Sequence, residues 1–187
     1  MKYLIAGLGN IGDEYANTRH NIGFVVLGAL AASLNTSFIR GRYASVATAR
    51  FKGRKLVLIK PSTYMNLSGK AVRYWLETEK IPLENLLVIM DDIDLDPGVL
   101  RMKASGSGGS HNGLNHIIEI LGTTSFPRLR FGIGSNFAKG FQVDYVLGRW
   151  TRAEEDLLKP KVLMAVDMVK SFVTTGIDRT MSLYNNK

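Results

Sequence analysis

The sequence predicts an α/β fold, a single-domain three-layer sandwich in which helices flank a mixed, mostly parallel twisted sheet. Short segments rich in β-branched and aliphatic residues alternate with longer amphipathic segments, as strands alternate with helices. A hairpin turn at Phe51-Lys52-Gly53-Arg54-Lys55 predicts that one strand pair is antiparallel. The 187 residues contain no repeat or linker-like tract, so we expect one domain over residues 1–187.

The expected strands are short apolar runs bounded by turn residues. The first runs straight into a glycine loop, and the second and third form the hairpin. We expect strands at Lys2–Ala6, Ser45–Phe51, Lys55–Lys60, Leu86–Met90, Val99–Lys103 and Arg128–Gly134.

Four helices are expected between and after these strands. Ile22–Leu34 is apolar and rich in alanine, and Leu67–Lys80 places its apolar residues on one face. Leu114–Leu121 has apolar residues at helical spacing and ends before a glycine. The Thr151-x-x-Glu154 pattern resembles a capping box that opens a helix toward Thr174, with a kink or restart at its internal proline.

Composition restricts the classes of protein. The chain is 45% hydrophobic and 21% charged, has no apolar run long enough to span a membrane, and starts without a signal-peptide pattern. We therefore expect a cytoplasmic protein without a membrane partner. The absence of cysteine excludes disulfides and thiolate metal sites. Imidazole chemistry is left to His20, His111 and His116, of which we expect His116 on the surface.

Positive charge is concentrated in the first half of the chain. The net charge is +8, and no Asp or Glu lies between Tyr15 and Leu76. Such a one-signed stretch favours a polyanionic partner, most simply nucleic acid, over a basic protein without such a partner. The stretch carries Arg19, Arg40, Arg42, Arg50, Lys52, Arg54, Lys55, Lys60, Lys70 and Arg73.

The loop Gly7–Gly12 follows the first strand and is followed by Tyr15 and Thr18–Asn21. Its glycines allow close backbone approach, while Asn10 and His20 bring directional polar groups. The G-x-G-x-x-G spacing also matches a dinucleotide-binding loop. That alternative requires a helix that opens within the loop and an acidic residue about 20 positions later, and the sequence has neither.

A second polar segment, Asp91–Gly98, follows the strand at Leu86–Met90. Its alternating acids mimic a calcium loop, but a proline replaces the required glycine and Lys103 occupies the position of the final Glu. Asp91 is the best candidate to orient a histidine. The later acids of the segment, Asp94 and Asp96, are expected to form a solvated turn.

Two further loops enter helices. Ser105–Gly113 is glycine-rich, and a glycine loop at a helix N-terminus is suited to anions, although a flexible linker has the same composition. Lys103, Arg128 and Arg130 add cations suited to phosphate. In Pro61–Gly69, Asn66 is a polar candidate that on local grounds could simply cap the following helix.

Together these segments resemble, in order and over nearly the whole chain, the motifs of bacterial peptidyl-tRNA hydrolases. Ile11 departs from the family's usual proline, Ser110 from its usual glycine, and Gly106–Gly109 from its glycine pattern. The matching motifs are G-L-G-N with T-R-H-N-x-G-F (Gly7–Asn10, Thr18–Phe24), P-x-T-Y-M-N-x-S-G (Pro61–Gly69), D-D-x-D-L (Asp91–Leu95), G-x-H-N-G-L (Gly109–Leu114), R-L-R-F-G-I-G (Arg128–Gly134) and V-L-G-x-W (Val146–Trp150).

The resemblance implies an enzyme that hydrolyses the ester between a peptide and the 3′-terminal ribose of tRNA, recycling tRNA from abandoned translation. It implies His20 as the base that activates water, Asp91 as its orienting carboxylate and Asn10 as a third catalytic residue. Lys103 and Arg130 resemble a clamp on the tRNA 5′-terminal phosphate. It also implies a monomer that needs neither a metal nor a cofactor. The implied substrate-binding residues are Tyr15, Tyr64, Met65, Asn66, His111 and Asn112.

Other functions remain as alternatives to this interpretation. A non-catalytic RNA-binding module explains the charge equally well, but it does not explain His20 and Asp91 beside three segments that carry Asn. A serine esterase requires a G-x-S-x-G elbow, which is absent. A metallohydrolase requires more ligands than three scattered histidines and one acidic cluster.

Overall fold

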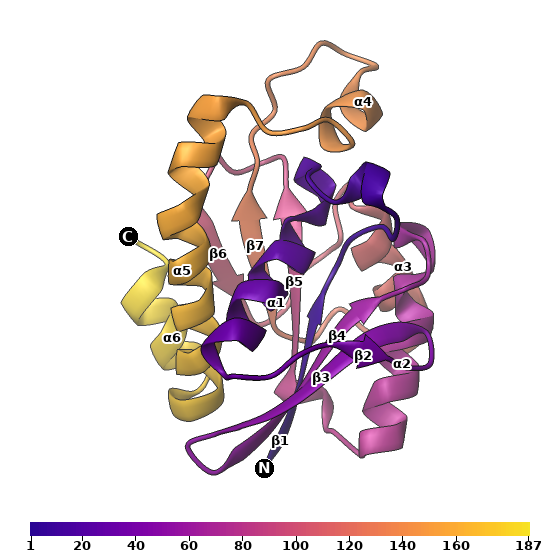
Figure 1. Ribbon diagram of the computed structural model, residues 1–187, viewed down its shortest axis with the longest axis vertical. Coiled ribbons are helices and arrows are strands. Elements are labelled where there is room, and N and C mark those ends of the chain that lie inside the picture. Colours follow the sequence, from indigo (N-terminus) through magenta and orange to yellow (C-terminus); the bar gives the residue numbers. More distant parts are fainter.

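A computed structural model describes residues 1–187 as helices packed on both faces of one twisted sheet (Figure 1). The sheet has seven strands in the order β2-β3-β4-β1-β5-β7-β6. The pairs β4–β1, β1–β5 and β5–β7 are parallel, whereas β2–β3, β3–β4 and β6–β7 are antiparallel. The strands are β1 (Lys2–Gly7), β2 (Ile39–Arg40), β3 (Ala44–Phe51), β4 (Arg54–Pro61), β5 (Leu86–Asp92), β6 (Leu100–Lys103) and β7 (Arg128–Gly132).

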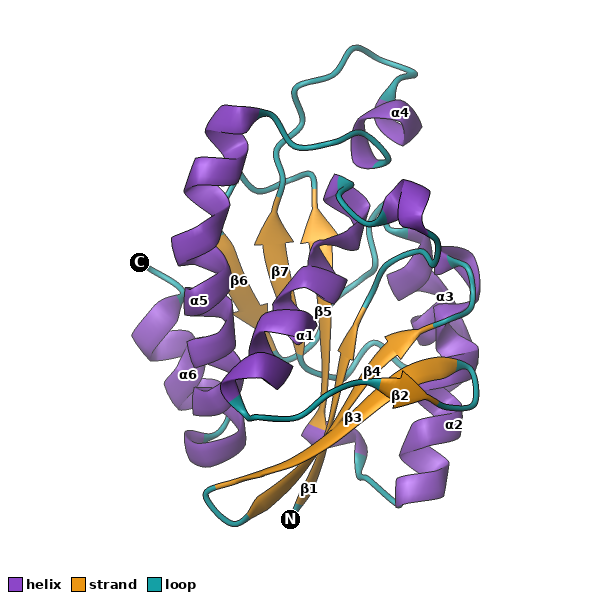
Figure 2. Ribbon diagram, in the orientation of Figure 1, coloured by secondary structure: helices purple, strands orange, loops and turns teal.

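Helices cover the two faces of this sheet in pairs (Figure 2). The helices α1 and α5 pack on one face and α2 and α3 on the other. The helices are α1 (Ile22–Ser33), α2 (Ser68–Glu79), α3 (Asn112–Leu121), α4 (Gln142–Val146), α5 (Arg152–Thr175) and α6 (Ile177–Tyr184). Short 3₁₀ turns lie at Asp13–Tyr15, Arg19–Asn21, Met65–Leu67 and Leu83–Asn85.

The α/β class, the mixed sheet and all ten expected elements are therefore confirmed, with ends displaced by at most two residues. The capping box at the start of α5 is also present, since Thr151 Oγ1 accepts from Glu154 N at 3.2 Å. Pro160 neither breaks nor restarts that helix. Three elements were not predicted: β2, α4 and α6. The first two are only 2 and 5 residues long, too short for a periodic signal.

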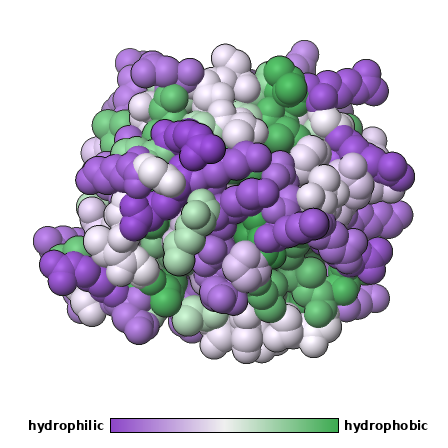
Figure 3. All heavy atoms as spheres, turned by 90° about the horizontal axis from the view of Figure 1, so that it is seen from below, coloured by the Kyte–Doolittle hydropathy of each residue, from purple (hydrophilic) through white to green (hydrophobic).

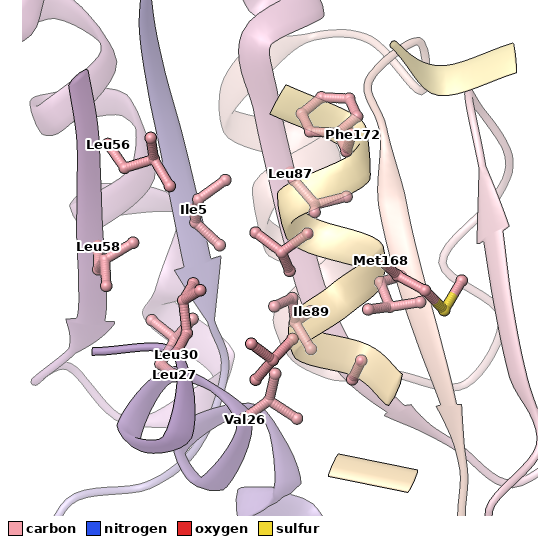
Figure 4. Packing of buried hydrophobic residues seen from close by; sticks show 14 of the residues in the cluster. Ile5, Val26, Leu27, Leu30, Leu56, Leu58, Leu87, Ile89, Met168 and Phe172 are labelled. Carbon is pink, nitrogen blue, oxygen red and sulfur yellow. The ribbon is translucent and has the colours of Figure 1, made fainter. Parts of the chain in front are cut away.

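Apolar side chains of the central strands point alternately to the two faces of the sheet, so they form two separate cores. In β1, Tyr3 and Ile5 face α1 and α5, whereas Leu4 and Ala6 face α2 and α3. Successive side chains of a strand point to opposite faces, so a central strand that is apolar throughout serves both layers. Figure 4 shows the first core, where Ile5 and other strand residues meet the side chains of α1 and α5.

The carboxyl ends of the parallel strands β4, β1, β5 and β7 meet at one edge of the sheet, near α4 in Figure 1. The opposite end of the molecule is mostly hydrophilic, with apolar residues in small groups (Figure 3). Ligands of open α/β sheets bind at the carboxyl ends, next to the strand where the connections change direction. Here that strand is β1. No helix of the chain combines the length and apolarity needed to cross a membrane.

Gly7, the last residue of β1, is explained by helix packing. A Cβ on Gly7 would lie 2.4 Å from Gly23 O, and a Cβ on Gly23 would lie 2.5 Å from Leu8 N. The start of α1 therefore rests directly on the backbone of the loop. The dinucleotide alternative does not fit, because two 3₁₀ turns separate the loop from α1, so no helix opens within the loop.

Candidate functional site

Three side chains from three distant segments meet at the carboxyl edge of the sheet. His20 lies in the 3₁₀ turn before α1, Asp91 at the carboxyl end of β5, and His111 immediately before α3. His20 Nδ1 lies 2.8 Å from Asp91 Oδ2, and His111 Nε2 lies 2.8 Å from Asp91 Oδ1. One carboxylate thus holds two imidazoles, and sequence reasoning identified only the first of these two contacts.

The protonation pattern of the rings follows from their neighbours. His111 Nδ1 accepts a hydrogen bond from Leu114 N at 3.1 Å and so caps α3. Its proton must then lie on Nε2, which donates to Asp91. His20 Nδ1 donates to the other carboxylate oxygen, so in the neutral ring Nε2 is the acceptor, and it has no partner in the protein. The ring of His20 lines a cleft.

Asp91 is held ionised at this point. Its side chain is only 2% exposed, and burial opposes ionisation. The charges and hydrogen bonds of His111 and His20 outweigh burial and hold the pKa of the Asp91 carboxyl well below its ordinary range. An ionised Asp91 can accept both N–H groups and stabilise positive charge on either ring.

The cleft beside His20 has a volume of about 190 Å³. Asn112, Lys103 and Arg130 also line it, so His20 and both predicted phosphate contacts share one space. Lys103 is exposed, whereas Arg130 Nε pairs with Asp92 Oδ2 at 2.6 Å. The remaining walls are the end of β5, the glycine loop before α3, and Gln142, Val143 and Val146 of α4.

Asn10 is held in place by hydrogen bonds to two neighbouring segments. Its Oδ1 accepts from Met65 N at 2.8 Å, and its backbone N–H and C=O both bond the amide of Asn21 at 2.8 Å. Asn10 Nδ2 has no partner within the protein, so this donor is free for a ligand. Sequence reasoning quoted Asn21 within a motif but gave it no role. In the structure this buried side chain holds the glycine loop beside the His20 turn.

The remaining predicted substrate residues lie outside the wall of this cleft. Tyr64 and Asn66 are exposed, Tyr15 is half-buried, and Met65 is buried. Met65 belongs to the neighbourhood of the site, because a Cβ on Gly113 would lie 2.6 Å from Met65 Sδ and 3.1 Å from His111 Cε1. Asn66 does not cap α2, which begins two residues later without a side-chain cap.

Arg128 also lines the cleft, but its side chain is buried and already donates to the carbonyls of Phe126, Thr124, Gly106 and Ser107. These bonds fasten the glycine loop, a role that the sequence did not predict. Burial and the nearby Arg130 lower the pKa of Arg128 to about 10.

His116 is half-buried and not on the open surface. Its Nδ1 accepts from Gly69 N at 2.9 Å, which satisfies a free N–H in the first turn of α2. The expectation failed because only the helix packing of α2 against α3 brings these two residues together.

The donor atoms of His20, Asp91 and His111 lie within 4.8 Å of one another, as the ligands of a metal would. Both carboxylate–imidazole distances are 2.8 Å, and His111 Nε2 carries the proton that Asp91 accepts. Two ligand atoms of one tetrahedral Zn²⁺, each about 2.0–2.2 Å from the ion, would lie farther apart than this, and the imidazole nitrogen would have to be deprotonated. This geometry fits a hydrogen-bonded triad.

Known proteins match the chain along its full length. A profile of the family described as peptidyl-tRNA hydrolase matches residues 4–187. Peptidyl-tRNA hydrolases of Phocaeicola vulgatus and Bacteroides fragilis are 57% and 55% identical, with 100% of each chain covered. The crystal structure of peptidyl-tRNA hydrolase from Acinetobacter baumannii superposes with a TM-score of 0.93 at 34% identity, over 98% of this chain and 94% of that one.

The nucleosidase of Campylobacter jejuni that acts on 5′-methylthioadenosine and S-adenosylhomocysteine shares the fold alone, at 11% identity and a TM-score of 0.52. The sequence matches, in contrast, extend through every segment that surrounds His20, Asp91 and His111. The chain therefore belongs to the peptidyl-tRNA hydrolase family.

Proposed function

We propose that this protein hydrolyses the ester between a peptide and the 3′-terminal ribose of peptidyl-tRNA. The observation that carries the proposal is the free Nε2 of His20 in a ring that lines a cleft and is oriented by a buried Asp91. Nε2 takes a proton from water as the water attacks the ester carbonyl, and Asp91 stabilises the imidazolium that forms. The proton then passes to the departing 3′ oxygen of the ribose.

Three asparagine side chains supply hydrogen-bonding groups without charge. In the proposal the Nδ2 donor of Asn10 faces the ester, Asn66 contacts the peptide, and Asn112 at the start of α3 holds water or the developing oxyanion. Tyr15, Tyr64 and Met65 border the peptide and the terminal adenosine. His111, also expected to bind substrate, lines the cleft and in the proposal additionally holds Asp91 through its hydrogen bond.

The partner is tRNA in this proposal. Lys103 and Arg130, which line the same cleft as His20, would bind the 5′-terminal phosphate. Much of the acid-free stretch stays available to a polyanion, since of its ten basic residues only Arg19 and Lys55 form ion pairs. We also expect a cytoplasmic monomer.

The direct test is the release of peptide from an N-blocked aminoacyl-tRNA in excess EDTA and ¹⁸O-water, with unblocked aminoacyl-tRNA as the matched control. The proposal predicts rapid cleavage of the blocked substrate alone, with one ¹⁸O in the released carboxylate. tRNA binding without cleavage would leave the alternative of an RNA-binding module. Cleavage that EDTA abolishes would assign the chemistry to a metal.

A further inference from the structure

Arg19 is a buried cation that the proposed reaction does not use. It precedes His20 in the Arg19–Asn21 turn, and its side chain is 9% exposed. Removing a guanidinium from water is costly unless its donors are satisfied. The partners of Arg19 therefore indicate what the residue does.

Every nitrogen of the guanidinium has a partner in the segment that contains α4 and the start of α5. Arg19 Nη2 and Nε donate to the two carboxylate oxygens of Glu154 at 3.0 and 3.3 Å. Arg19 Nη1 donates to the backbone oxygen of Tyr145 at 3.0 Å. The guanidinium carbon also lies 4.1 Å from the Tyr145 ring centroid and 5.7 Å from that of Trp150.

Backbone contacts join the same two segments, the turn that carries His20 and the segment that contains α4 and the start of α5. Arg19 N donates to Gly148 O at 3.0 Å, and Thr18 forms an isolated β-bridge with Arg149. A Cβ on Gly148 would lie 2.9 Å from Arg19 Nη1, so a glycine at this position lets the guanidinium approach closely. The turn that carries His20 is thus fastened to residues 142–154 by both side chain and backbone.

That segment forms one wall of the cleft. Val143 and Val146 of α4 line the cleft together with His20. The wall is anchored elsewhere too, since Tyr145 Oη donates to Ile133 O just beyond β7 and Thr151 caps α5 next to Glu154. Arg19 therefore connects the turn that carries His20 with the segment that contains α4 and the start of α5.

We propose that Arg19 is a positioning residue for the reaction, which holds the His20 imidazole and the α4 wall of the cleft in register through Glu154 and Tyr145. The inference rests on the hydrolase function proposed above. Arg19 itself touches no substrate. A lysine would keep the charge but not the planar fork that bonds both carboxylate oxygens and the Tyr145 carbonyl at once.

The kinetic test compares Arg19→Lys, Glu154→Gln and the double variant with the native chain on N-blocked aminoacyl-tRNA. We expect kcat of Arg19→Lys to fall about 10- to 100-fold, because small displacements of a base are costly, with KM changing less than about threefold. Because both substitutions break the Arg19–Glu154 ion pair, kcat of the double variant should lie within about twofold of kcat of Arg19→Lys. Glu79→Gln is the matched control, since Glu79 pairs with Lys55 away from the cleft.

A second readout needs no activity. Amide hydrogen exchange of the folded protein should become at least about tenfold faster over residues 142–150 in Arg19→Lys, and stay unchanged over α3. If the native chain cleaves no substrate, the proposed function fails, and this readout still decides whether Arg19 holds the wall.

Two results would overturn the inference. One is native kcat together with native exchange over residues 142–150 in Arg19→Lys. The other is an equal loss of kcat in Glu79→Gln, which would show that general destabilisation and not the junction lowers the rate. Melting temperatures of all variants, measured in parallel, ensure that the rates refer to folded protein.

Discussion

The rings of His20 and His111 lie 4.9 Å apart, centroid to centroid, because each donates to a different oxygen of Asp91. The two rings are nevertheless not equivalent. His111 uses both nitrogens within the protein, one for Asp91 and one for the first turn of α3. His20 uses one, so the second nitrogen is free to accept a proton in the cleft.

Replacing His111 should separate positioning from substrate binding. His111→Ala removes both the cap of α3 and one of the two donors to Asp91, so we expect the free energy of unfolding to fall by about 2 kcal/mol. We expect kcat to fall about tenfold with little change in KM, because the Asp91 carboxylate loses its fixed orientation. Steady-state kinetics and urea unfolding measure both effects.

His116→Ala is the matched control, because His116 lies on the helix that His111 caps and accepts one backbone N–H without touching Asp91. It should cost about 1 kcal/mol of stability and leave kcat unchanged. A large KM effect in His111→Ala with unchanged kcat would show that His111 binds substrate directly.

The ionised Asp91 should make stability sensitive to acid. Because its pKa is lower in the folded chain than the unfolded value near 3.9, its contribution is full above that value and is lost as the pH falls through the lower, folded pKa. We expect Asp91→Asn to cost about 2 kcal/mol near neutral pH, a deficit that shrinks below about pH 4. Unfolding curves at several pH values test this, with the exposed Asp96→Asn as control. A deficit that stays constant down to pH 2 would contradict an ionised Asp91.

The phosphate contacts should be visible in the salt dependence of binding. Lys103→Ala and Arg130→Ala should each lower the slope of log K against log salt for tRNA by about 1. Arg50 is exposed near the carboxyl end of β3, away from the cleft, so Arg50→Ala should change this slope much less. Removal of the 5′ phosphate from the tRNA should erase the effect of Lys103→Ala. Equal slopes for all three variants would show that Lys103 and Arg130 do not bind the 5′-terminal phosphate.

The packing of α1 on the glycine loop predicts opposite effects of two alanines in one helix. Gly23→Ala should cost about 3 kcal/mol or more, because its Cβ would meet backbone atoms of Leu8 and Ile89 at 2.5–2.7 Å. Gly28→Ala should stabilise the protein by about 0.5–1 kcal/mol, since its Cβ would meet only the end of Lys60 at 3.8 Å. Thermal unfolding of both variants measures this, and a tolerated Gly23→Ala would refute the close approach.

Sequence reasoning was accurate where local signals are strong. The period of the apolar residues predicted the strands and long helices. The strand end pointed to Asp91 as an orienting carboxylate, and the family resemblance paired it with His20. It was less accurate where tertiary contacts decide. The role of Arg128 depends on a loop that passes over its guanidinium, and that of His116 depends on how α2 lies against α3. The second contact of Asp91, with His111, likewise exists only in the folded chain.

The α4 wall and its link to Arg19 had no sequence signal. Glu154 was recognised as part of a capping box, but its second partner lies 135 residues earlier in the chain. Gln142 and Ser110, which bond across the cleft at 3.1 Å, are likewise far apart in sequence. Such contacts follow from the order of the strands in the sheet, which periodicity does not specify.

The most direct test of the account measures kcat and tRNA affinity of His20→Ala beside the native chain and His116→Ala, on N-blocked aminoacyl-tRNA. The account predicts that His20→Ala loses about 10³-fold or more in kcat while its affinity for tRNA stays within about threefold, and that His116→Ala keeps native turnover. Turnover of His20→Ala near the native value would contradict the account, because the free nitrogen of His20 would then not be the base.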